Sequence, residues 1–110
     1  MAEYRDEKIG SRIKELAAMY IEREGGLTSF ITLTRVELLP NSKKATLYIS
    51  VLPREKEQAA YGFIKRNLGD IRKYIEKNLK IRPVPFLEVV IDEGEKNRQR
   101  IDEILIKDKN

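Results

Sequence analysis

The sequence predicts an α+β fold in which helices pack on one face of a three-stranded sheet. Apolar residues recur at the 3.6-residue period of a helix near the N-terminus and again in the middle of the chain, whereas three other stretches are rich in β-branched and apolar residues. The chain has 110 residues, 41% of them hydrophobic, which is enough to form one core but not two. We therefore expect one layer of helices on one sheet.

The first predicted elements are an amphipathic helix over residues 5–24 and a strand over residues 28–38. Gly25 and Gly26 supply the helix end, because glycine tolerates the left-handed conformation found there. The alternation of the strand slips after Leu33, which indicates either a β-bulge or burial on both faces. The helix stripe that we expect to be buried consists of Ile9, Ile13, Leu16, Ala17 and Tyr20.

The next predicted elements form an antiparallel hairpin. Residues 39–44 carry the Pro and Asn of a turn, and residues 45–51 alternate cleanly between an apolar and a polar face. Two adjacent strands with a short connection pair in antiparallel orientation. Pro53 ends the second strand.

Two helices and a third strand complete the fold. We expect one helix over residues 55–68, an interruption at Gly69, and a second helix in which Asp70 is the N-cap or a first-turn acid. That helix buries Ile71, Tyr74, Ile75 and Leu79. The prolines of residues 82–85 impose an extended entry into a strand over residues 86–91, which is apolar on both faces except at Glu88 and so suits a strand covered on both faces.

The domain predicted in this way covers residues 1–94. Residues 95–110 form an extension that is either a short helix or partly disordered, because its polar face is continuous and its tail has nothing to bury.

The composition excludes several kinds of chemistry. The absence of Cys rules out disulfides and thiolate metal sites, and the absence of His removes the commonest general base and metal ligand. We therefore expect no enzyme, no cofactor and no metal site. The charged start is not a signal peptide, and no apolar run has the length of a membrane span, so we expect a cytoplasmic protein.

The positive charge is concentrated in one segment. Residues 63–82 hold seven basic and two acidic residues, a balance of +5, whereas the rest of the chain holds fifteen basic and sixteen acidic residues. Such a concentration is typical of a phosphate-binding surface. The alternative is an ordinary solvated helix face.

The predicted element order is that of a K-homology domain of type II. In such domains a glycine-containing loop between two helices clamps a nucleic-acid backbone, because glycine lets the main chain approach phosphate. Here the joint is Asn67-Leu68-Gly69-Asp70, with one glycine and an acid. We therefore expect the surrounding Lys and Arg side chains to contribute more to binding than the loop backbone does.

The ordered motifs resemble the ribosome-binding factor A family. The hairpin over residues 36–51, Gly69-Asp70-Ile71-Arg72, residues 79–87 with their Arg-Pro-x-Pro-x-Leu pattern, and Asp92 carry the resemblance. It implies a maturation factor that binds the free small (30S) ribosomal subunit and its 16S rRNA and assists late rRNA processing. It also implies a kinked helix pair, no enzymatic activity and, for some members, a maturation GTPase as partner. We expect a monomer.

The candidate RNA-binding residues gather around the joint, with two more at the hairpin. Asn67 is also explained as a C-cap of the first helix, and Gly69 as a helix stop. A helix-turn-helix module for DNA and a protein-interaction domain for an acidic partner remain as alternatives. The candidates are Lys65, Arg66, Asn67, Gly69, Arg72, Lys73, Lys77, Lys80 and Arg82, and, at the hairpin, Lys43 and Lys44.

Overall fold

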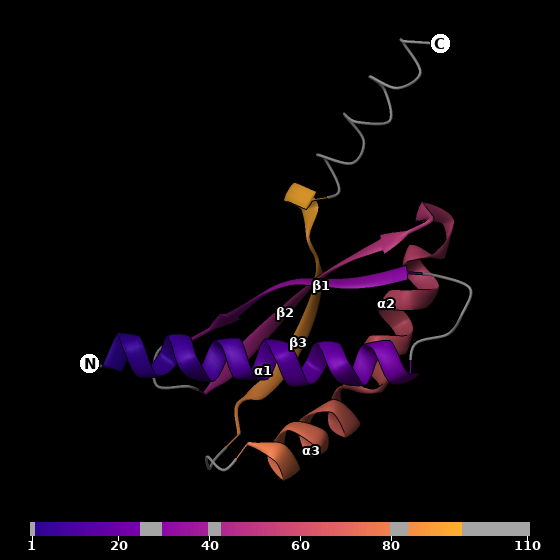
Figure 1. Ribbon diagram of the computed structural model, residues 1–110. Helices are drawn as coiled ribbons and strands as arrows, with labels where there is room; N and C mark the ends of the chain where they lie inside the picture. The colour runs from indigo at the N-terminus through magenta and orange to yellow at the C-terminus, as the bar shows by residue number, and fades with distance from the viewer. Residues whose placement is uncertain (1, 25–29, 40–42, 80–83, 96–110) are drawn as a thin grey trace.

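The computed structural model describes residues 2–24, 30–39, 43–79 and 84–95 and shows three helices and a three-stranded sheet (Figure 1). No helix within these ranges has the length and apolar character needed to cross a bilayer. The elements are α1 (Ala2–Glu24), β1 (Phe30–Leu38), β2 (Lys44–Leu52), the short 3-10 helix η2 (Arg54–Lys56), α2 (Glu57–Arg66), α3 (Leu68–Asn78) and β3 (Phe86–Ile91).

The central strand of the sheet is β2. It pairs with β1 in antiparallel orientation, from Phe30 opposite Leu52 to Leu38 opposite Ala45, which confirms the predicted hairpin. On its other side it pairs with β3 in parallel orientation. Both β1 and β3 are therefore edge strands of a mixed sheet.

A β-bulge causes the slip in the alternation of apolar and polar residues along β1. The register passes from Leu33 opposite Ile49 directly to Arg35 opposite Tyr48, so Thr34 is the extra residue. An extra residue reverses the side-chain alternation that follows it, which explains why Leu33 and Val36 both contribute to the core.

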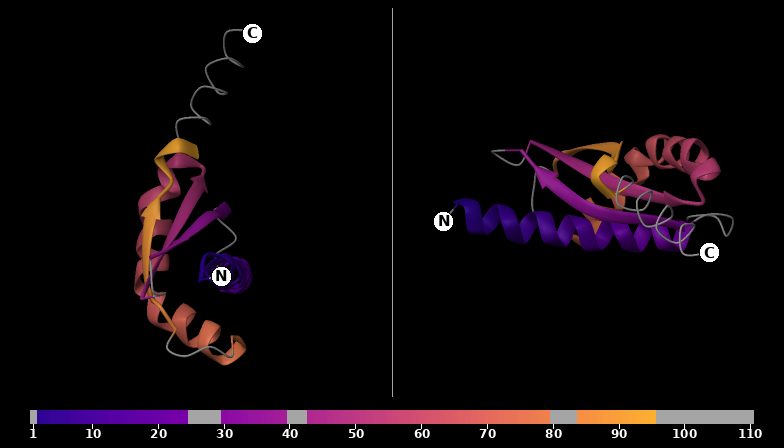
Figure 2. Two further views of the ribbon diagram at one scale, coloured as in Figure 1. Left: turned by 90° about the vertical axis from the view of Figure 1, so that its left-hand side faces the viewer. Right: turned by 90° about the horizontal axis from the view of Figure 1, so that it is seen from above.

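One core joins the sheet to all three helices. Alternate residues of β2, among them Leu47 and Ile49, are fully buried, and the buried stripe of α1 packs with them. In Figure 1, α1 runs along the lower side of the strands with α3 beneath it, and the left view of Figure 2 shows α1 end-on beside the sheet. The core residues of the two later helices and their ends are Ala60, Ile64, Ile71, Ile75 and Leu79.

The boundary between the last two helices differs from the prediction. Helix α2 ends at Arg66 and α3 begins at Leu68, so the interruption is at Asn67 and the prediction of an interruption at Gly69 is wrong. Gly69 lies inside α3, and no described glycine has a positive φ. Asp70 lies in the first turn of α3, one of the two places predicted for it.

Other boundaries move by a few residues. The first helix starts at Ala2 instead of residue 5, β2 gains one residue at each end, and the predicted helix start at residue 55 is a 3-10 turn before α2. The third strand has its predicted bounds, but the prediction that both its faces are covered is wrong, because Phe86 and Glu88 are exposed. The two-glycine helix stop, the tip of the hairpin turn, Pro83 and the extension beyond Glu95 lie outside the described residues.

A hydrogen bond across β2 ties the two edge strands together. The bulge residue Thr34 places its hydroxyl oxygen 2.5 Å from Oδ2 of Asp92, which follows β3, and 3.1 Å from the Tyr48 carbonyl. A hydroxyl has one proton, and the shorter contact to a carboxylate shows that it donates to Asp92. This donor, the Glu95 and Gly94 N–H groups and the Arg35 guanidinium hold the pKa of Asp92 below its usual range.

We expect Thr34→Val to lower the free energy of unfolding at neutral pH by about 1–3 kcal/mol, since a partly buried carboxylate loses a donor. Because the folded pKa of Asp92 is depressed, its contribution is present above the unfolded pKa and is lost as the pH falls through the folded value. The difference between the variant and the wild type should therefore shrink below about pH 4. Urea unfolding of both proteins at neutral and at acid pH measures this difference in unfolding free energy. Thr32→Val, at an exposed site of the same strand, is the control, and a pH-independent difference would refute the assignment.

Candidate nucleic-acid interface

The joint between α2 and α3 is one residue, Asn67, which stays close to helical geometry with φ −100° and ψ 7°. Its backbone N–H donates to the carbonyls of Phe63 and Ile64, and its carbonyl accepts from Ile71 N–H at 2.9 Å. Its side-chain Nδ2 donates to the Phe63 carbonyl at 2.8 Å. The Asn67 side chain therefore caps the end of α2, as one of its two sequence interpretations predicted, and gives α3 no side-chain cap.

The first helix holds the joint from the side. The Tyr20 hydroxyl of α1 lies 3.3 Å from Oδ1 of Asn67, to which it donates. The Tyr20 ring meets the Tyr74 ring of α3 edge to face at 6.0 Å, and the Arg23 guanidinium lies over Tyr74. Burial raises the pKa of Tyr20, and the nearby carboxylates of Asp70 and Glu24 raise it further. Tyr20 therefore stays a neutral donor that connects α1 to the joint and to α3.

Four predicted basic residues near the joint are exposed. Lys65 and Arg66 occupy the last turn of α2, and Lys73 and Lys77 lie one turn apart on the outer side of α3. None of the four takes part in an ion pair with another described residue. Lys65 lies near the Tyr61 ring, 5.9 Å from its centroid. These four side chains are available to an anionic partner, and we call them the joint cations.

Arg72 has a different environment. Its Nε donates to the Pro85 carbonyl at 3.2 Å and its terminal NH2 group donates to the Val84 carbonyl at 2.8 Å. Its guanidinium carbon lies 4.8 Å from the centroid of the Phe86 ring. Arg72 therefore joins α3 to the start of β3.

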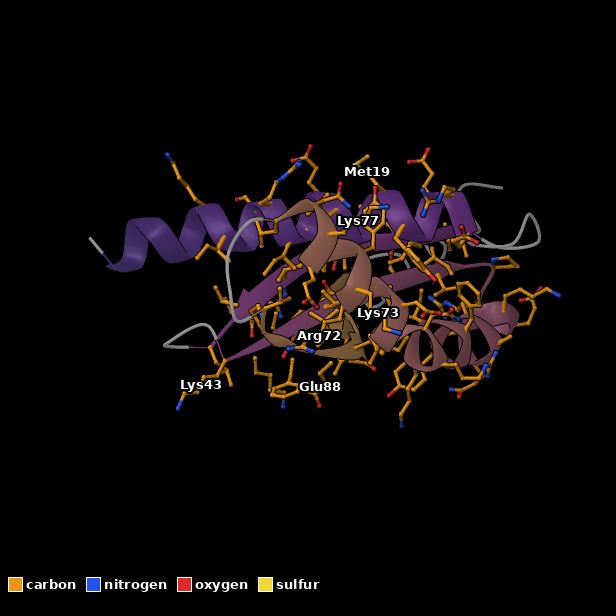
Figure 3. All side chains as sticks on the ribbon, turned by 90° about the horizontal axis from the view of Figure 1, so that it is seen from below. Met19, Lys43, Arg72, Lys73, Lys77 and Glu88 are labelled. Atoms are coloured by element: carbon orange, nitrogen blue, oxygen red, sulfur yellow. The ribbon has the colours of Figure 1, made fainter. Side chains whose placement is uncertain are left out.

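The two hairpin lysines lie beside the start of β3. Lys43 is exposed and its carbonyl accepts from Phe86 N–H, whereas Lys44 Nζ forms an ion pair with Glu88 at 2.7 Å. In Figure 3, which looks onto α3, Lys43 and Glu88 lie on the same side of the helix as Arg72, and Lys77 lies toward α1. Lys80 and Arg82 lie outside the described residues.

The site thus has two parts, the joint cations and a second group around Arg72. Sequence patterns gave no signal for Tyr20 as the support of the joint, since it has the pattern of an ordinary core residue of α1. They also missed Phe86, because its exposure depends on which face of β3 the helices leave uncovered. Among the described residues, no group of three or more acidic side chains is placed to hold a metal ion.

The position of Gly69 inside α3 leads to a stability prediction. A Cβ built on Gly69 meets nothing within 4 Å, and the same holds for Gly10 in α1. Alanine at either site should raise the free energy of unfolding by about 0.5–1 kcal/mol, because it restricts the unfolded chain at no steric cost. Chemical unfolding of Gly69→Ala and of Gly10→Ala tests this, and a loss of stability in Gly69→Ala alone would show that the joint needs glycine.

Known proteins share both the sequence pattern and the fold. The family model described as Ribosome-binding factor A matches residues 5–105. Ribosome-binding factor A of Clostridium botulinum (strain Loch Maree) is 28% identical over 109 residues, covering 96% of this chain and 91% of that protein. The protein of the same name from Thermodesulfovibrio yellowstonii is 37% identical over 76 residues, covering 69% of this chain and 64% of its own.

The structures that resemble this fold carry the same description as these relatives. The crystal structure of ribosome-binding factor A from Thermus thermophilus has a TM-score of 0.67 at 17% identity, covering 76% of this chain and 91% of that one. The solution structure of a Thermotoga maritima protein, a putative ribosome binding factor A, has a TM-score of 0.62 at 28% identity, covering 76% and 82%. A homology model of the T. thermophilus factor, fitted into the map of a 30S complex, has a TM-score of 0.67 at 18% identity, covering 76% and 90%. The family model extends over nearly the whole chain, including the hairpin, the helix joint and the entry into β3, and so the chain belongs to the ribosome-binding factor A family.

Proposed function

We propose that this protein binds the free small (30S) ribosomal subunit through its 16S rRNA and assists late rRNA processing and subunit assembly. The joint cations form the contact, with Lys65 and Arg66 on one side of Asn67 and Lys73 and Lys77 beyond it. Membership of the family supports the ribosomal partner, as does the 30S complex in which a protein of the same fold was fitted.

The observation that carries the proposal is that these four cations are exposed and make no ion pair within the described part of the chain. Elsewhere, Lys44 and Arg12 are neutralised by Glu88 and Glu15. The phosphates of a nucleic acid can neutralise several such cations, and the nucleic acid releases its condensed counterions when it binds them.

The geometry of the joint favours contact by side chains over contact by the loop backbone. Asn67 replaces a clamp loop with one residue of nearly helical geometry, and Asp70 adds a negative charge to the first turn of α3. A phosphate at the α3 N-terminus would be repelled by that carboxylate. The lysines and Arg66 reach farther from the helix axis and can contact phosphates away from it.

The proposal is tested by sedimentation of the protein with free small subunits, large subunits and assembled ribosomes on a sucrose gradient. We expect co-sedimentation with free small subunits only. If about four phosphates are neutralised, the logarithm of the affinity should fall with the logarithm of the salt concentration at a slope near −3. Binding that does not depend on salt would contradict the phosphate contact and would favour a protein partner.

We further propose that the protein acts in the cytoplasm as a monomer and that a maturation GTPase promotes its release from the subunit. Depletion in the source organism should raise the amount of 16S precursor RNA, and the wild-type chain should restore processing.

A further inference from the structure

The aromatic ring of Phe86 is unusually open to solvent. Phe86 is 70% exposed, more than any other large hydrophobic residue whose side chain the structure describes. In the parallel register it lies beside Lys44, and it alternates with the core-facing Leu87 and Val89, so its side chain belongs to the face of the sheet opposite the core, the outer face. Single exposed apolar residues are common in proteins, so exposure alone does not indicate a site.

The ring is held in a fixed position on one of its two faces. The Arg72 guanidinium lies over it at 4.8 Å, and the same guanidinium is anchored by the carbonyls of Val84 and Pro85. Phe86 N–H donates to the Lys43 carbonyl at 3.1 Å. Because one ring face is covered by Arg72 and most of the residue is exposed, the opposite face is open.

The charges around the open ring are mostly positive. Lys43 is exposed, Lys44 is next to Phe86 in the register, and Arg72 is behind the ring. Glu88 is the acidic neighbour, and it pairs with Lys44. The balance of these four charged groups is positive, which suits a ligand that carries phosphate.

The Tyr48 ring of the outer face is already engaged by its neighbours. The Arg35 guanidinium stacks on the Tyr48 ring at 3.9 Å and bonds Glu37, and the Tyr48 hydroxyl donates to Glu37 at 2.8 Å, which raises the pKa of Tyr48. Among the side chains of this face that the structure describes, the aromatic ring left open is that of Phe86.

We propose that Phe86 is a stacking platform for one unpaired base of single-stranded RNA, with Lys43 and Arg72 beside the phosphates that flank this base. An aromatic ring with one open face and neighbouring cations is the arrangement by which proteins hold splayed bases without reading their sequence. The proposal rests on the proposed RNA-binding function and adds a second contact, on the β3 side of the site. The joint cations hold structured rRNA by its backbone, and Phe86 holds a strand end or loop.

The test uses a short uridine-rich single-stranded RNA, with an RNA duplex of the same length for comparison. Phe86→Leu keeps an apolar side chain of similar size but cannot stack, and we expect its affinity for the single strand to fall roughly 5- to 150-fold, with little change for the duplex. The chain has no Trp, so Phe86→Trp introduces a single fluorophore. We expect Phe86→Trp to bind at least as tightly as the wild type and its fluorescence to be quenched by the RNA.

Leu39→Ala is the matched control, because Leu39 is an exposed apolar residue beside the same end of β2. Equal losses in Leu39→Ala and Phe86→Leu would overturn stacking, because any loss of apolar surface at this end of the sheet would then have the same effect. Wild-type binding to the single strand in Phe86→Leu, or no binding by the wild type itself, would also overturn it. Thermal unfolding verifies that each variant folds.

Subunit sedimentation keeps this inference separate from the proposed function. If the wild type sediments with small subunits and Phe86→Leu binds the single strand normally, the function stands and the platform is refuted. If the wild type does not sediment with subunits but binds the single strand through Phe86, the platform stands and the ribosomal role is refuted.

Discussion

Charge reversal at Lys73 and Lys77 should lower the affinity for free small subunits by on the order of 100-fold or more at moderate salt, because two charge-assisted phosphate contacts become repulsive. Both side chains are exposed on the outer side of α3, so the fold should be unchanged. The salt slope of the remaining binding should be smaller by about 1.5, since two fewer phosphates are neutralised. Sedimentation of Lys73→Glu/Lys77→Glu with subunits over a salt series measures both effects.

The control variant must change the net charge by the same amount as Lys73→Glu/Lys77→Glu, but at sites away from the joint. Lys14 on α1 and Lys56, which precedes α2 at the end away from the joint, are both exposed. Lys14→Glu/Lys56→Glu should bind within a few-fold of the wild type, because distant exposed charges are largely screened. If the two double variants lose affinity equally, binding reflects net charge alone and the proposed interface is wrong.

Ile71→Ala should cost about 2–5 kcal/mol of unfolding free energy, the largest stability effect that we expect from a single substitution near the joint. Ile71 is fully buried in the first turn of α3, in the core cluster that joins the helix pair to the sheet. Such a loss is a large part of the total for a domain of this size and should lower the midpoint of thermal unfolding by about 10 °C or more. Urea unfolding followed by circular dichroism gives the value.

A graded series separates the cavity from other effects. Ile71→Val removes one methylene and should cost roughly 0.5–1.5 kcal/mol. Leu39→Ala, at a half-exposed site, should cost less than Ile71→Ala. An Ile71→Ala variant as stable as Leu39→Ala would show that α3 does not depend on this contact with the core.

Much of the fold follows from the hydrophobic periodicity. Buried residues of α1 and β2 fall at the helical and strand spacings because those spacings place them on one face, and the third strand was predicted with its observed bounds. The bulge left a visible slip in β1. Its position at Thr34 depends on the register with β2, which one strand alone does not contain.

The joint could not be located from sequence. A glycine inside a helix costs only about 1 kcal/mol relative to alanine, so Gly69 suggests a break that the packing of Ile71 and Ile64 overrides. Asn67 interrupts the helix with torsion angles that many residues adopt. Its side chain bonds Tyr20 of another helix and the Phe63 carbonyl one turn earlier, and neither contact can be predicted from the residue type.

The candidate site was likewise predictable only in part. The positive charge near the joint was readable from composition, but the partners of each cation were not. Lys44 and Arg72 look like Lys65 and Lys73 in sequence, yet they bind Glu88 and backbone carbonyls, respectively. Whether a cation is available to RNA depends on its neighbours in space.

The parallel pairing of β3 with the central strand also determines how late the sheet can form while the chain is being synthesised. The hairpin and α1 come first from the ribosome, whereas the second edge of β2 has no partner until Phe86–Ile91 has been translated, after both later helices. Contacts of such long sequence separation form late, and an unpaired strand edge is open to wrong pairing until they do. The nascent protein therefore completes its sheet only when most of its length has left the exit tunnel.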